Sequence, residues 1–492
     1  MPCVNSYNHH FLNGNTASNL ADKFKKKAKK NVMQNTHVDQ LTPVIYPGQA
    51  PRKKILFACV PGDGHFSPLT GIAKHLQSMG YDVRWYCSSS YREKIQKLDI
   101  PFYPFDAGLE VTGETADQVF PERTAIKSAI KKLNYDIIHF FIRRGPEYYA
   151  DMVNIYRSFP FDLVIADCAF TGIPFVTDKM NIPVVSIGVF PLTESSKDLA
   201  PSGLAITPSY SFAGKIKQRI MHWVANKFLF KVSNEEMKRV MGEYGIDCNN
   251  ASLFDLMIQK SDLLLQSGTP GFEYKRSDLG KNIRFVGPLL PYARKGKKEQ
   301  WFDQKLHQYK HVVLVTQGTV ERDTEKILVP TLEAFKDSDT LVIATTGGSQ
   351  TKELQARFPH QNIIIADFIP FADVMPHADV YITNGGYGGV MLGIENHLPL
   401  VVAGIHEGKN EINARVGYFK LGINLKTEKP SPDQIRKAVT EVISNGIYKK
   451  NIKNLSKEFK AYDTYKLCAA YVEELLQSSV KPASILTDVI RN

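Results

Sequence analysis

The sequence predicts an α/β protein built from two Rossmann-like domains, each a doubly wound parallel sheet, that face each other across a cleft. At 492 residues the chain is longer than one ordinary domain. Short β-branched runs alternate with longer helical patterns, which is typical of parallel sheets covered by helices on both faces. The alternation begins at Lys54 and begins again at His311, after a polar connector at 291–300. Two sheets are therefore expected, each binding ligands beyond the carboxyl ends of its strands.

The first half contains apolar runs that predict buried strands. A helix is expected to follow the first run, from about Ser67 to Met79, because Leu69, Ile72 and Leu76 recur on one helical face. The predicted strands of this half lie in the runs 54–60, 81–87, 162–168 and 183–189.

The second half repeats this pattern, with predicted strands in the runs 311–319, 340–346, 362–367, 379–383 and 399–404. A final amphipathic helix is expected from about Ile452 to Ser478. The chain is divided at its changes of composition into a disordered basic tail (1–50), an N-terminal domain (51–292), a C-terminal domain (293–455) and a terminal helix (456–492).

Basic side chains are concentrated in the first 54 residues. This segment holds nine Lys or Arg and two Asp, so +7 of the formal net charge of +11 lies there and +4 is spread over the rest. A remainder this small and dispersed argues against a nucleic-acid groove. The Lys-rich segment at 23–30 is interpreted as a solvated tail, with weak contact to an anionic membrane surface as the alternative.

The sequence also indicates the compartment. No apolar run approaches the ~18 residues that cross a bilayer, and the first twenty residues lack the apolar stretch of a secretory signal. The six cysteines form no CxxC pair, which favours reduced core residues. We therefore expect a cytoplasmic protein. We also expect it to be a monomer or a weak dimer.

The densest glycine cluster follows the predicted strand that ends at Thr383. Gly385, Gly386, Gly388 and Gly389 then lead into a helix. Backbone without side chains can approach a pyrophosphate closely, and the N–H groups at a helix start supply hydrogen-bond donors. The turn is therefore a predicted anion site, with tight strand–helix packing as the alternative reason for its glycines.

Three motifs carry a resemblance to a known family: PGDGHFSPL at 61–69, ADFIPFADVMPHADV at 366–380 and the glycine-rich segment at 378–414. From about Lys54 to the C-terminal region, the chain resembles the inverting nucleotide-sugar glycosyltransferases of the UDP-glucuronosyltransferase and macrolide-glycosyltransferase type, in their bacterial form. The resemblance implies the two-domain GT-B fold. It also implies a UDP-sugar donor held by the C-terminal domain and an acceptor held by the N-terminal domain.

The resemblance assigns the donor contacts position by position. Phe368 is expected to stack on uracil, with the backbone of Ile369 reading the edge of the base. Gly318 and Thr319 match the family's phosphate contacts, and the turn from Gly385 to Gly389 is expected to hold the diphosphate.

Three positions depart from the family pattern. Asn384 stands where the family usually has a histidine that touches a phosphate; an amide still donates a hydrogen bond, but without the strength of a charged donor. The acidic residue that often binds the ribose falls at Leu392, and Glu395 is the nearby substitute. The Asp-Gln pair that commonly reads the sugar hydroxyls falls at Lys409 and Asn410, of which Asn410 is able to replace the glutamine.

A histidine and an aspartate are the candidate catalytic groups. Transfer to a hydroxyl requires removal of its proton, and a histidine with a pKa near neutrality suits that task. His65 follows the first predicted strand, and Asp167 ends a later strand of the same half, where its carboxylate would fix the imidazole tautomer. The resemblance implies the same pair, and Gly64 is expected to leave room for the imidazole. A plain helix-start histidine and an N-cap aspartate are the alternatives.

The acceptor pocket is expected between two segments of the N-terminal domain. The stretch at 190–214 is long and rich in Pro, Ser and Gly, as functional lids often are, and the stretch at 135–149 carries aromatic residues. Phe140, Phe141, Phe190 and Leu192 are the predicted lining residues. An ordinary surface loop and core helix are the alternative. The acceptor expected is a hydrophobic small molecule with a hydroxyl, such as a phenol, polyketide or terpenoid.

The predicted reaction moves a sugar, for which we expect glucose, from a UDP-sugar co-substrate to that hydroxyl with inversion. No Asp-x-Asp stands at a donor position and no His/Cys/Asp cluster has the spacing of metal ligands, so neither a metal nor another cofactor is expected. Two alternatives stay open: a sugar-nucleotide 2-epimerase of the same fold, and a nucleotide-sugar binding protein without catalysis.

Overall fold

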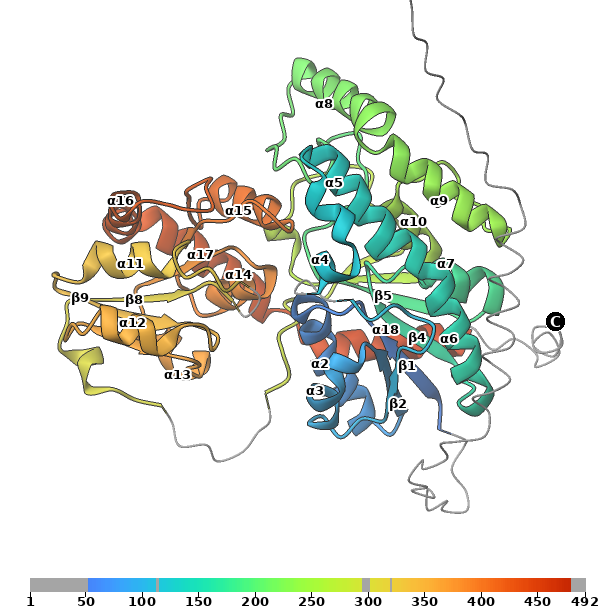
Figure 1. The fold of residues 1–492 in the computed structure, drawn as a ribbon, viewed down its shortest axis with the longest axis horizontal. Coiled ribbons are helices and arrows are strands. Elements are labelled where there is room, and N and C mark those ends of the chain that lie inside the picture. Colours follow the sequence, from blue (N-terminus) through green and yellow to red (C-terminus); the bar gives the residue numbers. More distant parts are fainter. Residues whose placement is uncertain (1–51, 112–114, 294–300, 319–320, 479–492) are drawn as a thin grey trace, which may run out of the picture. The chain divides into compact units, whose positions relative to one another are not determined.

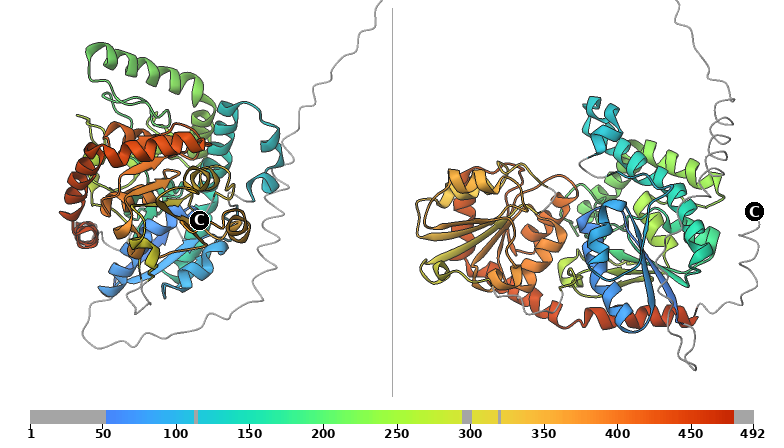
Figure 2. Two further views of the ribbon diagram at one scale, coloured as in Figure 1. Left: turned by 90° about the vertical axis from the view of Figure 1, so that its left-hand side faces the viewer. Right: turned by 60° about the horizontal axis from the view of Figure 1, so that its bottom comes forward.

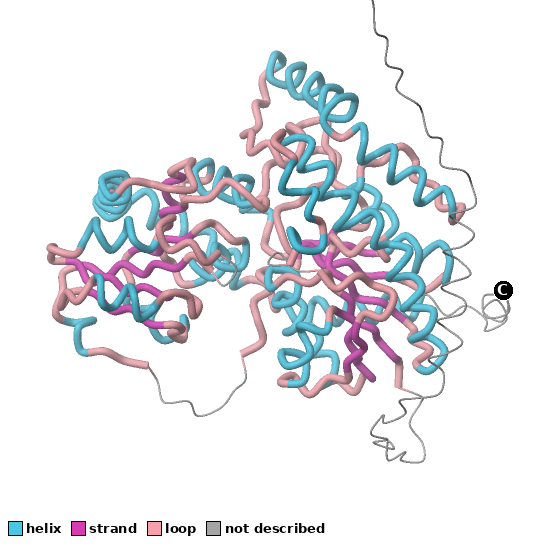
Figure 3. The backbone as a smooth tube through the Cα atoms, viewed as in Figure 1, coloured by secondary structure: helices cyan, strands magenta, loops and turns pink. Residues whose placement is uncertain are grey.

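The computed structural model describes residues 52–111, 115–293, 301–318 and 321–478, which belong to one compact unit that begins at Arg52. The predicted basic tail, Cys3 and Thr319 lie outside the described residues. Two parallel β-sheets with helices on their faces make up this unit (Figure 1). Figure 3 distinguishes the strands of both sheets from the helices and loops around them.

The first sheet has seven parallel strands in the order β3-β2-β1-β4-β5-β6-β7. This order reverses direction between β1 and β4, as in a doubly wound fold. The strands are β1 Lys54–Ala58, β2 Asp82–Cys87, β3 Phe102–Pro104, β4 Leu163–Asp167, β5 Val184–Gly188, β6 Leu263–Gln266 and β7 Ile283–Phe285.

The second sheet repeats this plan with six parallel strands in the order β10-β9-β8-β11-β12-β13. Its strands are β8 His311–Thr316, β9 Thr340–Thr345, β10 Ile363–Ala366, β11 Val380–Thr383, β12 Leu400–Val402 and β13 Gly422–Asn424. The nine predicted runs all form strands, whereas β3, β6, β7 and β13 were not predicted.

Helices connect the strands in both halves (Figure 2). Among the described residues, no helix combines the length and the apolar character needed to cross a bilayer. In the first half the helices are α2 Asp63–Ser78, α3 Arg92–Gln96, α4 Ala116–Val119, α5 Ala129–Asp136, α6 Gly145–Ser158, α7 Ile173–Phe175, α8 Phe212–Val224, α9 Lys231–Glu243 and α10 Leu253–Lys260. In the second half they are α11 Leu328–Phe335, α12 Thr351–Arg357, α13 Phe371–Val374, α14 Tyr387–Glu395, α15 Lys409–Tyr418, α16 Pro432–Ser444, α17 Gly446–Lys460 and α18 Thr464–Ser478.

Each sheet has a hydrophobic core on both faces, which explains the continuous apolar runs. In β1, Ile55 and Phe57 belong to the cluster on one face, and Leu56 and Ala58 belong to the cluster on the other, because successive strand residues point to opposite faces. The second sheet has the same arrangement. The five cysteines among the described residues are free and buried, as predicted for core residues.

The C-terminal stretch predicted to be helical from about Ile452 to Ser478 is divided between two helices, α17 and α18. The helical segment breaks between α17 and α18, at 461–463. The last helix, α18, then packs against α2 of the first half, where Cys468 and Val472 join the same core cluster as Leu69 and Ile72. The end of the chain therefore completes the core of the first half.

Candidate active site

The strand order brings the candidate residues of each half to one place. In the first sheet β1 pairs with β4, so the loop after β1 lies beside the end of β4. In the second sheet β8 pairs with β11 in the same way. At these two points the order in which the strands are added to the sheet reverses. Open α/β sheets bind their ligands at such points. His65 and Asp167 flank the first such point, and Gly318 and Asn384 flank the second.

His65 lies in the first turn of α2, which starts at Asp63 and thus four residues before the predicted start. Gly62 is the N-cap residue, and its carbonyl accepts hydrogen bonds from the backbone N–H groups of His65 and Phe66, each at 2.9 Å. A methyl group at Gly62 would lie 3.1 Å from Cδ2 of His65, whereas a methyl group at Gly64 would have no neighbour within 4 Å. Gly62, and not Gly64 as predicted, therefore leaves room for the imidazole.

Asp167 holds the imidazole from the end of β4. Its Oδ1 atom lies 2.8 Å from Nδ1 of His65, and its two oxygens also accept the backbone N–H groups of Val60 at 2.8 Å and Ala169 at 2.9 Å. The carboxylate is fully buried, while a quarter of the His65 side chain is exposed. Three donors, the His65 ring and two backbone N–H groups, thus fix the carboxylate. Solvent reaches the imidazole but not the carboxylate.

This geometry determines what the histidine can do. An ionised carboxylate only accepts hydrogen bonds, so Nδ1 of His65 is the donor in the pair. The neutral ring then has an unprotonated Nε2 atom, which is able to accept a proton.

Burial and the neighbouring charge of Asp167 raise the pKa of the Cys168 thiol. This thiol therefore stays protonated and is a poor nucleophile.

The predicted acceptor residues do not form one group. The ring of Phe190 meets His65 edge-on, with the ring centroids 6.2 Å apart. Phe140 packs against Phe120 at 5.2 Å, and Phe141 packs against the core on the other face of the sheet. Leu192 is buried in the hydrophobic core, so its assignment as a lining residue was wrong. Of the four, Phe190 is the one whose ring contacts His65.

In the glycine turn between β11 and α14, one glycine is in close contact with a buried side chain and another faces open space. Gly385 has φ of +88°, and a methyl group on it would lie 1.8 Å from Oδ1 of Asn413. Asn413 is fully buried and donates to the carbonyls of Asn384 at 3.3 Å and Gly404 at 3.0 Å. A methyl group at Gly388 would meet nothing within 4 Å. Gly385 is therefore required by packing, whereas Gly388 leaves open space at the start of α14.

Asn384 has a role like that of Asp167 in the other half. Its Nδ2 group donates to the carbonyl of Gln317 at 2.5 Å, across to the loop after β8. Its Oδ1 atom accepts the backbone N–H of Gly386 at 3.2 Å. Gly318 follows Gln317 with φ of +80° and is exposed. In both halves, a side chain at the carboxyl end of the fourth strand fixes the loop after the first: Asp167 is the last residue of β4, and Asn384 directly follows β11.

Phe368, the residue predicted to stack on the uracil, is exposed, as stacking on a ligand requires. Phe368 is 70% exposed, whereas Ile369 is buried in the core of the second half. A large apolar ring exposed to this degree, next to a buried anchor, is free to stack on a planar ligand.

Glu395 does not lie at the glycine turn. It is the last residue of α14, six residues beyond Gly389 and thus ~9 Å along the helix axis. It lines a separate cavity of about 440 Å³ together with Lys449, Lys453 and Lys460. Its assignment as a ribose-binding substitute for the acid was therefore wrong. Leu392 stands where the family often has the ribose-binding acid, and its apolar side chain is half-buried.

Lys409 and Asn410 begin α15, but both side chains have protein partners. Nζ of Lys409 donates to Glu407 at 2.5 Å, and Nδ2 of Asn410 donates to the carbonyl of Gly203 at 2.9 Å. The next residue, Glu411, accepts the backbone N–H groups of Gly203 at 2.9 Å and Ala205 at 2.7 Å. The start of α15 thus binds the predicted acceptor loop directly.

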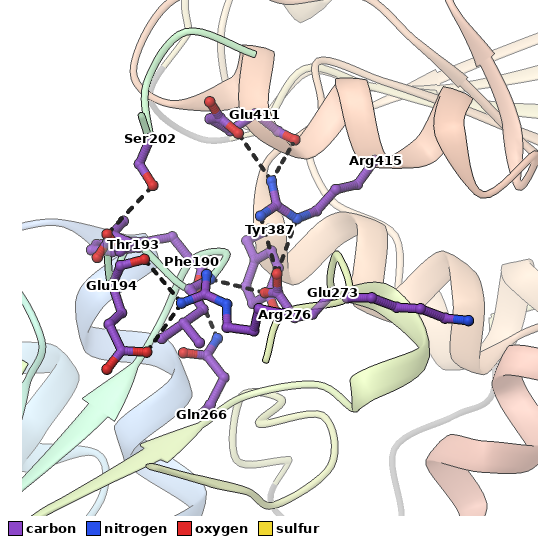
Figure 4. A network of polar contacts seen from close by, with 12 residues as sticks. Phe190, Thr193, Glu194, Ser202, Gln266, Glu273, Arg276, Tyr387, Glu411 and Arg415 are labelled. Carbon is purple, nitrogen blue, oxygen red and sulfur yellow. Dashed lines mark hydrogen bonds and ion pairs between the residues drawn. The ribbon is translucent and has the colours of Figure 1, made fainter. Parts of the chain in front are cut away.

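A buried charge network extends from this contact into both halves (Figure 4). Nη2 of Arg415 lies 3.0 Å from Glu273, and Nη1 of the same residue lies 3.0 Å from Glu411. Glu273 also accepts the backbone N–H of Leu192 at 2.9 Å, and the Arg415 guanidinium lies over the ring of Tyr274 at 4.3 Å. Sequence reasoning missed this network because Glu273 and Tyr274 are about 140 residues before Glu411 and Arg415 in the chain.

The described residues contain no group of three or more His, Cys, Asp or Glu side chains that is able to hold a metal ion.

The chain is similar to enzymes that act on natural products. Residues 330–475 match the family model described as the C-terminal domain of erythromycin biosynthesis protein CIII-like proteins. Over 411 residues the chain is 31% identical to 4'-demethylrebeccamycin synthase of Lentzea aerocolonigenes, and the match covers 83% of this chain and 96% of that protein. The chain belongs to the family 1 UDP-glycosyltransferases. A second glycosyltransferase, UDP-glucosyltransferase 1 of Beauveria bassiana (strain ARSEF 2860), is 30% identical, with 84% of this chain and 93% of that protein covered.

Solved structures of glycosyltransferases share the fold. The calicheamicin glycosyltransferase CalG4 superposes with a TM-score of 0.69 at 19% identity, covering 88% of this chain and 100% of that one. The glycosyltransferase of kitacinnamycin gives 0.68 at 16% identity, with 87% and 100% covered. The predicted GT-B fold is confirmed, and this glycosyltransferase has the two Rossmann-like domains that the sequence indicated.

Proposed function

We propose that this enzyme transfers glucose from UDP-glucose to a hydroxyl of a hydrophobic small molecule, with inversion at the anomeric carbon and with His65 as the general base. The observation that supports the base most directly is the 2.8 Å contact between Nδ1 of His65 and the buried Asp167. The relative from Beauveria bassiana is named for glucose transfer, which supports the choice of sugar. Phe190 beside the imidazole supports an apolar acceptor.

In the proposed reaction, the acceptor hydroxyl gives its proton to Nε2 of His65 as its oxygen attacks the anomeric carbon. The bond between that carbon and the diphosphate oxygen breaks at the same time, and Asp167 stabilises the imidazolium that forms. The leaving diphosphate collects negative charge, which the backbone N–H groups between Gly385 and Gly389 and the positive end of the α14 dipole stabilise. Phe368 is the proposed stacking partner of the uracil.

The test removes each member of the pair. In His65→Ala, transfer to a phenol or alcohol acceptor is expected to fall about 10²–10⁴-fold, while UDP-glucose binding measured by calorimetry is retained. Asp167→Asn is expected to lower kcat strongly as well, because the amide can donate to Nδ1 and favour the wrong tautomer. His75→Ala, on the same helix, is the matched control and is expected to keep its activity.

Three results would contradict the proposal. Full activity of His65→Ala would remove the histidine from the mechanism. Formation of an isomer from a UDP-sugar alone would favour a 2-epimerase. Donor binding without turnover, across several nucleotide sugars and a broad panel of hydroxylated natural products, would favour a binding protein.

We also propose that the reaction needs no metal, because the first turn of α14, which begins at Tyr387, offers backbone N–H groups to the diphosphate. Activity is expected to be unchanged after extensive treatment with EDTA. A loss that Mg²⁺ or Mn²⁺ restores would contradict this.

A further inference from the structure

The long helix α8 and its continuation expose apolar side chains on one face. Phe212 is 83% exposed, Trp223 is 56% exposed and Phe228 is 61% exposed, and Ile216 and Ile220 are also exposed. At about 100° per residue, Phe212, Ile216, Ile220 and Trp223 fall on one side of α8, and Phe228 follows in the π-helical turn Ala225–Leu229. In Figure 1 and in the left view of Figure 2, α8 lies at the periphery of the first half.

The opposite face of α8 is polar, and it is this face that contacts the protein. Gln218 is buried; its Oε1 atom accepts the backbone N–H of Ser209 at 2.8 Å, and its Nε2 group donates to the carbonyl of Asp198 at 2.8 Å. One turn further on, Nε2 of His222 lies 3.0 Å from the carbonyl of Leu199. An ordinary surface helix buries its apolar face and exposes its polar face. In α8 the arrangement is reversed, so packing within this protein does not explain the apolar stripe.

Basic side chains flank the apolar stripe on both sides. The sequence from 212 to 232 contains no Asp or Glu. Nζ of Lys227 lies over the ring of Trp223 at 4.9 Å and over the ring of Phe228 at 5.9 Å. Nζ of Lys215 lies 3.8 Å from Asp198, and Nζ of Lys231 lies 3.7 Å from Glu235; both contacts are long. The basic residues of the segment are Lys215, Lys217, Arg219, Lys227 and Lys231.

We propose that the apolar face of α8 binds an anionic lipid surface, with the helix lying in the plane of the headgroups. An apolar stripe that carries Trp and Phe, bordered by Lys and Arg, matches the chemistry of that interface. Leu204, Ile206 and Tyr210 in the loop before the helix are also exposed. A second copy of this chain is a poorer partner, because a symmetric dimer would bring two basic faces together.

The test measures co-sedimentation of the full chain with vesicles. Binding is expected to vesicles of equal parts phosphatidylglycerol and phosphatidylcholine, with a blue shift of the Trp223 fluorescence, and it is expected to weaken as salt is added. In the triple variant Ile216→Ser, Ile220→Ser and Trp223→Ser, the partition coefficient is expected to fall at least about tenfold.

A charge variant and a matched control separate the two contributions. Lys217→Gln, Arg219→Gln and Lys227→Gln together are expected to weaken binding by about 100-fold, since each basic group is worth about fivefold at an anionic surface. The control replaces the exposed Lys420, Lys437 and Lys457 by Gln and is expected to bind like the native chain. Circular dichroism and thermal unfolding are compared for all variants, because a folded variant that loses binding supports the surface role.

Two results would overturn the proposal. Absence of binding to the anionic vesicles at low salt is one, and binding that persists in folded α8 variants is the other, since it would assign the contact to a different part of the chain. A dimer that the Ile216→Ser, Ile220→Ser and Trp223→Ser variant converts to a monomer, in a chain without vesicle binding, would assign the stripe to a second copy.

Discussion

Gly62 controls the orientation of the His65 ring, because a methyl group there would lie 3.1 Å from Cδ2 of the imidazole. The residue has φ of −165°, an extended conformation that any residue adopts. A substitution at Gly62 therefore acts through the imidazole and not through backbone strain. Gly64, in the same turn, has no such neighbour.

We predict that Gly62→Ala lowers kcat about threefold to tenfold with little change in the KM for UDP-glucose. The added methyl group requires a shift of a few tenths of an ångström in the imidazole, and small displacements of a catalytic group are costly. Initial-rate kinetics check this. The matched variant Gly64→Ala is expected to keep its kcat, and an equal loss in both variants would show that the turn, and not the imidazole contact, is responsible.

The sequence was sufficient to predict the strands that bring His65, Asp167 and the glycine turn to the sheet edges, because each strand is a recognisable apolar run. The roles of these residues stay predictions. It was insufficient where the role depends on tertiary contact. Asn413 touches Gly385 from a helix 28 residues away, and no local pattern indicates that contact. Glu395 was misplaced because closeness in sequence to the glycine turn is not closeness in space along a helix.

At the scale of elements, length and burial together explain most of the differences between predicted and missed strands; the buried β6, with four residues, was also missed. The strands β1 and β8 are buried on both faces and appear as long β-branched runs. The strands β3, β7 and β13 have three residues each and are only partly buried, so they leave no clear pattern. The start of α2 was predicted late because glycines normally disfavour helix, while here Gly62 caps it and Gly64 lies in its first turn.

The contact between α15 and the rest of the chain depends on Arg415, which joins Glu273 to Glu411. We predict that Arg415→Met lowers the free energy of unfolding by about 3–5 kcal/mol, because it leaves a buried carboxylate at Glu273 without its partner. Urea unfolding measures this. The double variant Arg415→Met with Glu273→Gln is expected to lose less than the sum of the single variants, since the two side chains contact each other.

The matched control is Arg357→Met. Arg357 pairs with Glu325 at 2.5 Å, but both side chains are about half exposed. An exposed pair contributes about 0–1 kcal/mol, so a small effect is expected. Equal losses at Arg415 and Arg357 would contradict a special role of the buried network.

At the scale of the whole molecule, the two halves use one plan for two purposes. In each, a side chain at the carboxyl end of the fourth strand fixes the loop after the first: Asp167 does so next to His65, and Asn384 does so next to Gly318. In the proposed reaction one half presents the proton acceptor and the other presents backbone donors. The family resemblance predicts these roles, whereas the shared bracing by Asp167 and Asn384 became visible only in three dimensions.

The last helix connects the halves in a different way, because α18 follows the second half in sequence but belongs to the core of the first. Val472 is fully buried there, in one cluster with Leu69 and Ile72 of α2. We predict that Val472→Asp places an unpaired charge in that core and raises hydrogen exchange in β1, β2 and α2, while β8, β9 and β11 keep their protection. Gln477→Asp adds the same charge at an exposed position of α18 and is expected to leave exchange unchanged. A uniform rise across both sheets in Val472→Asp would instead mean that the two halves unfold as one cooperative unit.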